Sequence, residues 1–183
     1  MRRRRTRSGP SGRRATAIGA PRDLVSIARD LQATCLRGGV TVAVAESCTG
    51  GLLAAAITDV PGASAYFLGG VVSYSNAAKS ALLDVPEALL DRHGAVSAEV
   101  AAAMASGART RFQAELAVSV TGIAGPDGGT AEKPVGLVYL GLASPTGVAT
   151  VRERFAGDRA AVRRSAAARS LELLLEHARA LAT

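Results

Sequence analysis

The sequence predicts an α/β protein, built as a single-domain three-layer α/β/α sandwich around a mixed sheet. Two observations support this fold class. Helix-like and strand-like segments alternate along the chain, and the chain has 183 residues. That length suits one domain, which would bury roughly 70% of its unfolded surface. We therefore expect residues 23–183 to form the domain.

The first predicted elements alternate between helix and strand. Residues 23–37 place apolar side chains on one face and end at two glycines, which is typical of an amphipathic helix. The apolar run 40–45 predicts a buried strand, and residues 51–58 predict a short helix. Residues 65–74 predict a second strand, in which two adjacent glycines indicate a bulge or a close backbone contact.

The remaining elements complete the alternation. We expect helical structure over 76–93 with a break at Pro86, a helix over 97–112, a strand over 116–121, paired strands over 135–143 and 148–155, and a long helix from Gly157 onward. A glycine-rich loop, residues 122–129, follows the strand over 116–121. Its successive amides could form an anion-binding nest, although a plain connection is the alternative.

The net charge of +7 comes from one end of the chain. Residues 1–22 hold eight arginines and no acid, which leaves 14 basic against 15 acidic groups in the rest. This segment is rich in Gly, Pro and Ser and lacks an apolar period, so it predicts a disordered arm. Contact with nucleic acid is expected only through this arm, if at all.

Other classes of protein are disfavoured by composition. No apolar run approaches the roughly 18 residues that span a bilayer, so we expect no membrane partner. Cys35 and Cys48 form no CxxC pair, and with two distant histidines they do not make a zinc site. We expect no metal and no cofactor, and a reducing cytoplasm fits these thiols best.

The chain contains only two lysines against twenty arginines, and both lie in motif-like segments. Lys79 closes the run Tyr74-Ser-Asn-Ala-Ala-Lys79, and Lys133 lies in Glu-Lys-Pro-Val-Gly. An ammonium can lose its proton near neutral pH when it is desolvated, whereas a guanidinium cannot. The excess of arginine over lysine therefore indicates that lysine is kept only at positions where an arginine could not perform the same role. Chance placement of the two lysines is the alternative.

Ser47 is the candidate nucleophile. It follows the strand over 40–45 in the turn Glu46-Ser-Cys-Thr-Gly-Gly51, at the edge where open α/β sheets bind ligands. Backbone N–H groups from Cys48 to Gly51 would face an anion or a developing oxyanion. The alternative is that Ser47 or Thr49 only caps the next helix.

Lys79 is the candidate base, because a buried amine could accept the Ser47 proton before attack on an acyl carbon. A solvated lysine on a helix face is the alternative. His93 and His177 are competing bases, but both are expected near helix C-termini, outside polar clusters. Cys48 is a rival nucleophile whose ordinary role is that of a small buried side chain.

Six segments together resemble one known family. They are Ala45-Glu-Ser-Cys-Thr-Gly-Gly51, Gly70-Val-Val-Ser-Tyr-Ser-Asn-Ala-Ala-Lys79, Gly94-Ala-Val-Ser97, Val118-Ser-Val-Thr-Gly-Ile-Ala-Gly-Pro-Asp-Gly-Gly129, Lys133-Pro-Val-Gly136 and Phe155-Ala-Gly-Asp-Arg159. In this order they are similar to the nicotinamide-nucleotide amidohydrolases, the family of the CinA C-terminal domain. The resemblance covers about residues 24–181.

The resemblance implies hydrolysis of nicotinamide mononucleotide to nicotinic acid mononucleotide and ammonia, as part of pyridine nucleotide recycling. It implies Ser47 as nucleophile, Lys79 as base and Tyr74 as a group that assists Lys79. The turn at Thr121 and Gly122, with Arg159, would hold the phosphate, and Glu46 would brace the site. The expected substrate-binding residues are Glu46, Cys48, Thr49, Gly50, Gly51, Asn76, Thr121, Gly122 and Arg159.

Two other interpretations remain open at the level of sequence. The chain could be a non-catalytic interaction module linked to competence or DNA damage, as the family's older name indicates. It could also be an amidase for another small amide. A homo-oligomer is expected, since Ala-rich apolar helices leave room for one.

Overall fold

The computed structural model describes residues 23–182, and the arm predicted for residues 1–22 lies outside them. Within the described residues, five strands form a mixed sheet in the order β2-β1-β3-β4-β5. β1 runs parallel to β2 and β3, whereas β4 is antiparallel to both β3 and β5. The strands are β1 (Val42–Glu46), β2 (Phe67–Val72), β3 (Leu116–Gly122), β4 (Leu137–Ser144) and β5 (Gly147–Arg154).

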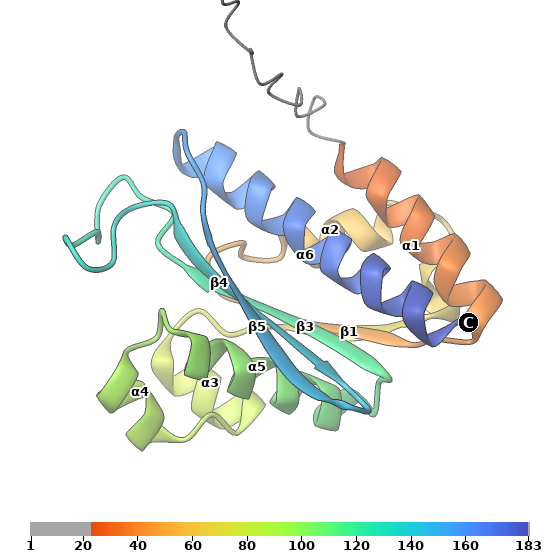
Figure 1. The fold of residues 1–183 in the computed structure, drawn as a ribbon, viewed down its shortest axis with the longest axis horizontal. Helices are drawn as coiled ribbons and strands as arrows, with labels where there is room; N and C mark the ends of the chain where they lie inside the picture. Colours follow the sequence, from red (N-terminus) through yellow and green to blue (C-terminus); the bar gives the residue numbers. More distant parts are fainter. Residues whose placement is uncertain (1–22, 183) are drawn as a thin grey trace, which may run out of the picture.

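Helices cover both faces of the sheet (Figure 1). α1, α2 and α6 lie on one face, and α3, α4 and α5 lie on the other, so the predicted three-layer α/β/α sandwich is confirmed. None of the helices within residues 23–182 is long and apolar enough to cross a membrane. The helices are α1 (Leu24–Gly38), α2 (Leu52–Thr58), α3 (Asn76–Leu83), α4 (Glu87–His93), α5 (Ala98–Phe112) and α6 (Arg159–Leu181), with a 3₁₀ turn at Ala63–Ala65.

The predicted elements differ from the observed ones mainly at their ends. The strand expected over 65–74 begins only at Phe67, because the preceding residues form the 3₁₀ turn. The break at Pro86 is confirmed, since α3 and α4 are separate helices. The bulge expected at the paired glycines falls one residue earlier: Val42 pairs with Phe67 and Ala43 with Gly69, which leaves Leu68 as the extra residue.

Side-chain caps fix the starts of α3, α5 and α6, as Asp23 does for α1. The Ser75 side chain accepts a hydrogen bond from an amide in the first turn of α3. Ser97 does the same for α5, and Asp158 does so for α6. A cap of this kind stabilises a helix by about 1 kcal/mol and defines the residue at which it begins. These three helix starts meet at the carboxyl end of β1, β2 and β3.

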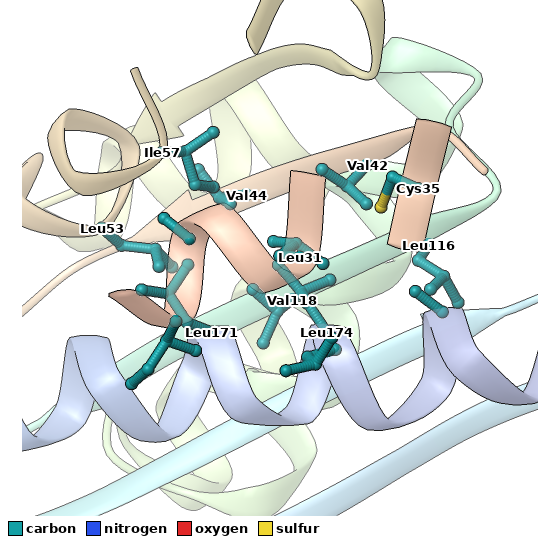
Figure 2. Packing of buried hydrophobic residues seen from close by; sticks show 14 of the residues in the cluster. Leu31, Cys35, Val42, Val44, Leu53, Ile57, Leu116, Val118, Leu171 and Leu174 are labelled. Carbon is teal, nitrogen blue, oxygen red and sulfur yellow. The ribbon is translucent and has the colours of Figure 1, made fainter. Parts of the chain in front are cut away.

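A large apolar cluster lies between the sheet and α1, α2 and α6 (Figure 2). Leu31, Val44, Val118 and Leu171 have no exposed surface, and burial of each such side chain contributes about 1.5–3 kcal/mol. A second cluster packs α4 and α5 against the opposite face. β1 and β3 are thus covered on both sides, which gives the polar groups at their ends a rigid support.

Candidate active site

Ser47 directly follows β1, where the chain turns towards α2. All five residues of β1 are buried. The Ser47 N–H donates to the Val120 carbonyl of β3 at 2.9 Å, so the turn is held against the neighbouring strand. Ser47 is 8% exposed and lines a cavity, at the sheet edge where the sequence predicts it.

Lys79 reaches Ser47 from α3. Its side chain is fully buried, and its Nζ lies 3.1 Å from Ser47 Oγ. The same Nζ donates to the Ser73 carbonyl at 2.8 Å and to the Tyr74 carbonyl at 3.4 Å. Residues 32 positions apart in the sequence therefore form one hydrogen-bonded pair.

The partners of Lys79 suit both protonation states of its amine. A neutral amine has two N–H donors and one lone pair. The Ser73 and Tyr74 carbonyls can only accept, so they take the two donors and leave the lone pair for the Ser47 hydroxyl proton. After proton transfer, the ammonium has three N–H donors for three oxygen acceptors. This arrangement can move a proton between Ser47 and Lys79.

Burial also shifts the acidity of the two neighbouring groups. Loss of hydration lowers the pKa of Lys79 from its ordinary value, which favours the neutral amine. Cys48 opposes this shift only as a thiolate, and burial raises the pKa of Cys48 to about 11. Near neutral pH Cys48 is therefore a thiol, which disfavours it as a nucleophile.

Glu46 does not face the cavity. It has no exposed surface, and its Oε2 accepts from the amides of Gly51 at 2.9 Å and Leu53 at 3.1 Å. Its Oε1 accepts from the amide of Ala54 at 2.8 Å. The carboxylate thus occupies the N-terminus of α2 and braces the turn that carries Ser47. This agrees with the bracing role that the resemblance implies for Glu46, whereas the expected contact of Glu46 with a substrate is not met.

The glycines after Ser47 also serve the turn itself. The Gly50 N–H donates to the Ser47 carbonyl at 3.1 Å, and the Gly51 N–H is held by Glu46. The prediction that these two amides face a ligand is therefore wrong. Thr49 has no exposed surface, and Asn76 lies in a separate hollow beside α4. Of the segment 48–51, only Cys48 lines the cavity at Ser47.

Arg159 joins two other parts of the site. Its Nη1 donates to the Gly125 carbonyl at 2.9 Å, and its Nη2 donates to the Tyr74 hydroxyl at 3.2 Å. Tyr74 is 62% exposed. The hydroxyl of Tyr74 therefore orients Arg159, and Tyr74 contacts Lys79 through its backbone carbonyl instead.

The cavity has a volume of about 270 Å³. It lies between the turn after β1, the start of α3, the turn between α4 and α5, the loop after β3 and the start of α6. Its lining residues are Ser47, Cys48, Tyr74, Lys79, Ala95, Val96, Thr121, Gly122, Ile123, Ala124, Gly125, Asp127, Gly128 and Arg159. Seven of the predicted site residues, Cys48 among them, meet at this cavity.

Ala95 and Val96 line the cavity, although neither was predicted as a site residue. Their side chains have no reactive or hydrogen-bonding group, and the only signal for them was their place in the segment Gly94-Ala-Val-Ser97. Thr121 holds this segment, because its Oγ1 donates to the Ala95 carbonyl at 2.8 Å. Neither His93 nor His177 lines the cavity, so the competing Ser/His arrangement is not formed.

Comparisons with known proteins agree with this architecture. Residues 24–178 match the model of the CinA C-terminal domain family. A CinA-like protein of Geotalea uraniireducens is 62% identical over 125 residues, which are 68% of this chain and 30% of that protein. The chain spans about a third of the length of the curated relatives it matches.

Solved structures are similar over the whole described domain. The competence/damage inducible protein CihA from Agrobacterium tumefaciens is 43% identical with a TM-score of 0.83, over 85% of this chain and 96% of that one. The competence damage-inducible protein A (ComA) from Klebsiella pneumoniae is 34% identical with a TM-score of 0.82, over 85% and 96% of the two chains.

Proposed function

The chain belongs to the CinA C-terminal domain family, and on this premise we propose that it is an amidohydrolase that converts nicotinamide mononucleotide to nicotinic acid mononucleotide and ammonia. One observation carries the proposal. The fully buried amine of Lys79 lies 3.1 Å from the Ser47 hydroxyl at the wall of a cavity. A nucleophile within hydrogen-bond reach of its base is the basic requirement of acyl transfer.

In the first half of the proposed reaction, Ser47 Oγ attacks the carboxamide carbon while its proton passes to Lys79 Nζ. The resulting ammonium then gives that proton to the amide nitrogen as the carbon–nitrogen bond breaks. Ammonia leaves, and the nicotinoyl group remains as an ester on Ser47. The Ser73 and Tyr74 carbonyls hold Lys79 Nζ in place throughout.

In the second half, a water molecule replaces ammonia. Neutral Lys79 accepts a proton from this water as its oxygen attacks the ester carbon. The bond to Ser47 Oγ breaks, and Lys79 returns the proton to that oxygen. Nicotinic acid mononucleotide is released, and the site regains its starting protonation state.

Arg159 supports a nucleotide as the substrate. A guanidinium has five N–H donors, and the two contacts to Gly125 and Tyr74 use only two of them. The remaining donors can bind a phosphate group in the bidentate geometry that arginine favours. We assign the phosphate to this end of the cavity and the carboxamide to the end at Ser47.

The test is ammonia release from nicotinamide mononucleotide by single variants. Ser47→Ala and Lys79→Ala are each expected to lower kcat at least about 10³-fold with retained far-UV circular dichroism. Lys79→Arg is expected to fail equally, because arginine keeps its proton. Ser64→Ala, at an exposed serine in the 3₁₀ turn, is the matched control and should keep full activity. Full activity of Ser47→Ala or Lys79→Ala would refute the mechanism.

A panel of small amides identifies the substrate. We expect nicotinamide mononucleotide to be preferred over nicotinamide and nicotinamide riboside, which lack the phosphate for Arg159. Equal rates for all three would indicate an amidase for another substrate. No ammonia from any amide would favour the non-catalytic interaction module.

The proposal places this reaction in the cytoplasm. Cys35 and Cys48 are both buried free thiols, and free thiols persist in reducing compartments. Burial raises the pKa of Cys35 to about 12, so little of it is present as the oxidation-prone thiolate.

A further inference from the structure

We propose that Lys133 is a positioning residue for nucleotide binding, because it fastens the loop after β3 to the turn between α4 and α5. Both segments line the cavity, so their separation affects its width. The inference depends on the proposed function for the identity of the ligand. Lys133 itself does not line the cavity and contacts neither Ser47 nor Lys79.

The central contact joins Lys133 to the end of α4. Lys133 Nζ donates to the His93 carbonyl at 2.6 Å, and the pair is partly buried. His93 is the last residue of α4, and Gly94 follows with φ 71°. Carbonyls at a helix C-terminus carry partial negative charge, so an ammonium is favoured there. The lysine thus stabilises the point at which α4 ends and the cavity wall begins.

The loop that carries Lys133 is itself a closed turn. The Lys133 N–H donates to Thr130 Oγ1 at 3.0 Å, and the Thr130 N–H donates to the Lys133 carbonyl at 2.9 Å. This outer part of the loop packs on a residue that lines the cavity: a Cβ at Gly125 would lie 2.6 Å from Val135 Cγ1, and Val135 follows Lys133 by two residues. A displacement of Lys133 would therefore reach the cavity lining at Gly125.

The turn between α4 and α5 lines the cavity and begins directly after His93. Ala95 and Val96 line the cavity, and two hydrogen bonds hold the backbone of residues 94–95 in place. Thr121 Oγ1 donates to the Ala95 carbonyl at 2.8 Å, and Ser97 Oγ donates to the Gly94 carbonyl at 3.0 Å. Lys133 adds the contact to the outer loop. Loss of this contact would remove a hydrogen bond that joins the loop to the turn between α4 and α5.

The expected consequence is a change in binding and not in chemistry. Lys133→Met keeps the length and apolar stem of the side chain but removes the donor to His93. We expect KM for nicotinamide mononucleotide to rise by about tenfold, with kcat changed by less than about twofold. Lys133→Arg should restore most of the affinity, since a guanidinium can donate to the same carbonyl. The expectation that arginine could not perform the same role therefore applies to Lys79, which must lose a proton, and not to Lys133.

Arg111→Met is the matched control. Arg111 Nη1 donates to the Leu82 carbonyl in the last turn of α3 at 3.1 Å, which is also a contact from a cation to a helix C-terminus. Neither residue lines the cavity. This variant should keep the KM of the wild type. An equal rise of KM in both variants would mean a general loss of rigidity and would overturn the inference.

Hydrogen–deuterium exchange tests the same contact without relying on activity. In Lys133→Met we expect faster exchange in residues 93–97 and 123–136, with no change in β1 or α6. Unchanged exchange in those two segments, or an unchanged KM, would overturn the inference, as would failure of Lys133→Met to fold. If the wild type released no ammonia from nicotinamide mononucleotide, the proposed function would fail while the exchange result still decided the role of Lys133.

Discussion

Glu46 and Lys79 are both buried beside Ser47, but their hydrogen-bond partners differ. The Glu46 carboxylate accepts three backbone N–H groups, which together offset its lost hydration. Lys79 meets only neutral oxygens, and the structure places no carboxylate of residues 23–182 against it. Glu46 therefore holds the backbone of the turn, whereas Lys79 is favoured in its neutral form. This difference suits a structural brace and a proton acceptor.

The lowered pKa of Lys79 predicts a pH-dependent stability. Between its native pKa and the ordinary value of 10.5, the unfolded chain binds more protons than the folded one. The stability of the wild type therefore rises with pH across this window. Lys79→Met lacks this contribution. The free energy of unfolding of the wild type, relative to that of the variant, should therefore be higher at pH 9.5 than at pH 7. Urea unfolding of both proteins at both pH values measures this difference. The same difference at pH 7 and pH 9.5 would contradict the lowered pKa.

At the level of elements, α2 depends on a carboxylate supplied by the preceding strand. Glu46→Gln removes the charge and one acceptor oxygen, which leaves a buried N–H group of the α2 start without a partner. We expect a loss of about 2 kcal/mol or more in the free energy of unfolding, with reduced activity because the Ser47 turn loosens. Glu87→Gln, at an exposed carboxylate in the first turn of α4, should cost less than about 1 kcal/mol. Similar losses in both variants would contradict this role of Glu46.

The sequence predicted most elements but only part of the site. Periodicity and glycine stops located the helices and strands, and the lysine bias led to Lys79. The partners of Glu46 were not predictable: its carboxylate accepts from amides at the α2 start, while the adjacent Ser47 faces the cavity. Ala95 and Val96 line the cavity without any chemical signal in their side chains. Such residues are found only when the chain is seen folded.

At the scale of the whole molecule, the site forms at one end of the parallel half of the sheet. Ser47 follows β1, Tyr74 follows β2, and Thr121 lies near the end of β3. Arg159 opens α6 and closes the cavity from a distant part of the sequence. This is the edge at which open α/β sheets commonly bind ligands. The site therefore requires nearly the whole domain.

The basic arm is expected to be separable from catalysis. All residues assigned to the reaction lie between Ser47 and Arg159, so deletion of residues 1–22 should leave kcat and KM within about twofold. Any affinity for DNA should fall with the arm, since its eight arginines are the main excess of positive charge. Ammonia assays and DNA titrations at two salt concentrations measure both. A large loss of activity on deletion would mean that the arm contributes to the site.

The contact between α1 and α6 bears on the order of events during synthesis (Figure 1). α1 leaves the ribosome early, but the helix that covers its apolar face is translated long afterwards. Until then, the part of this apolar face that α6 covers must stay exposed to solvent or to a chaperone. Nascent chains halted before α6 should therefore be open to proteases, whereas the finished domain resists them.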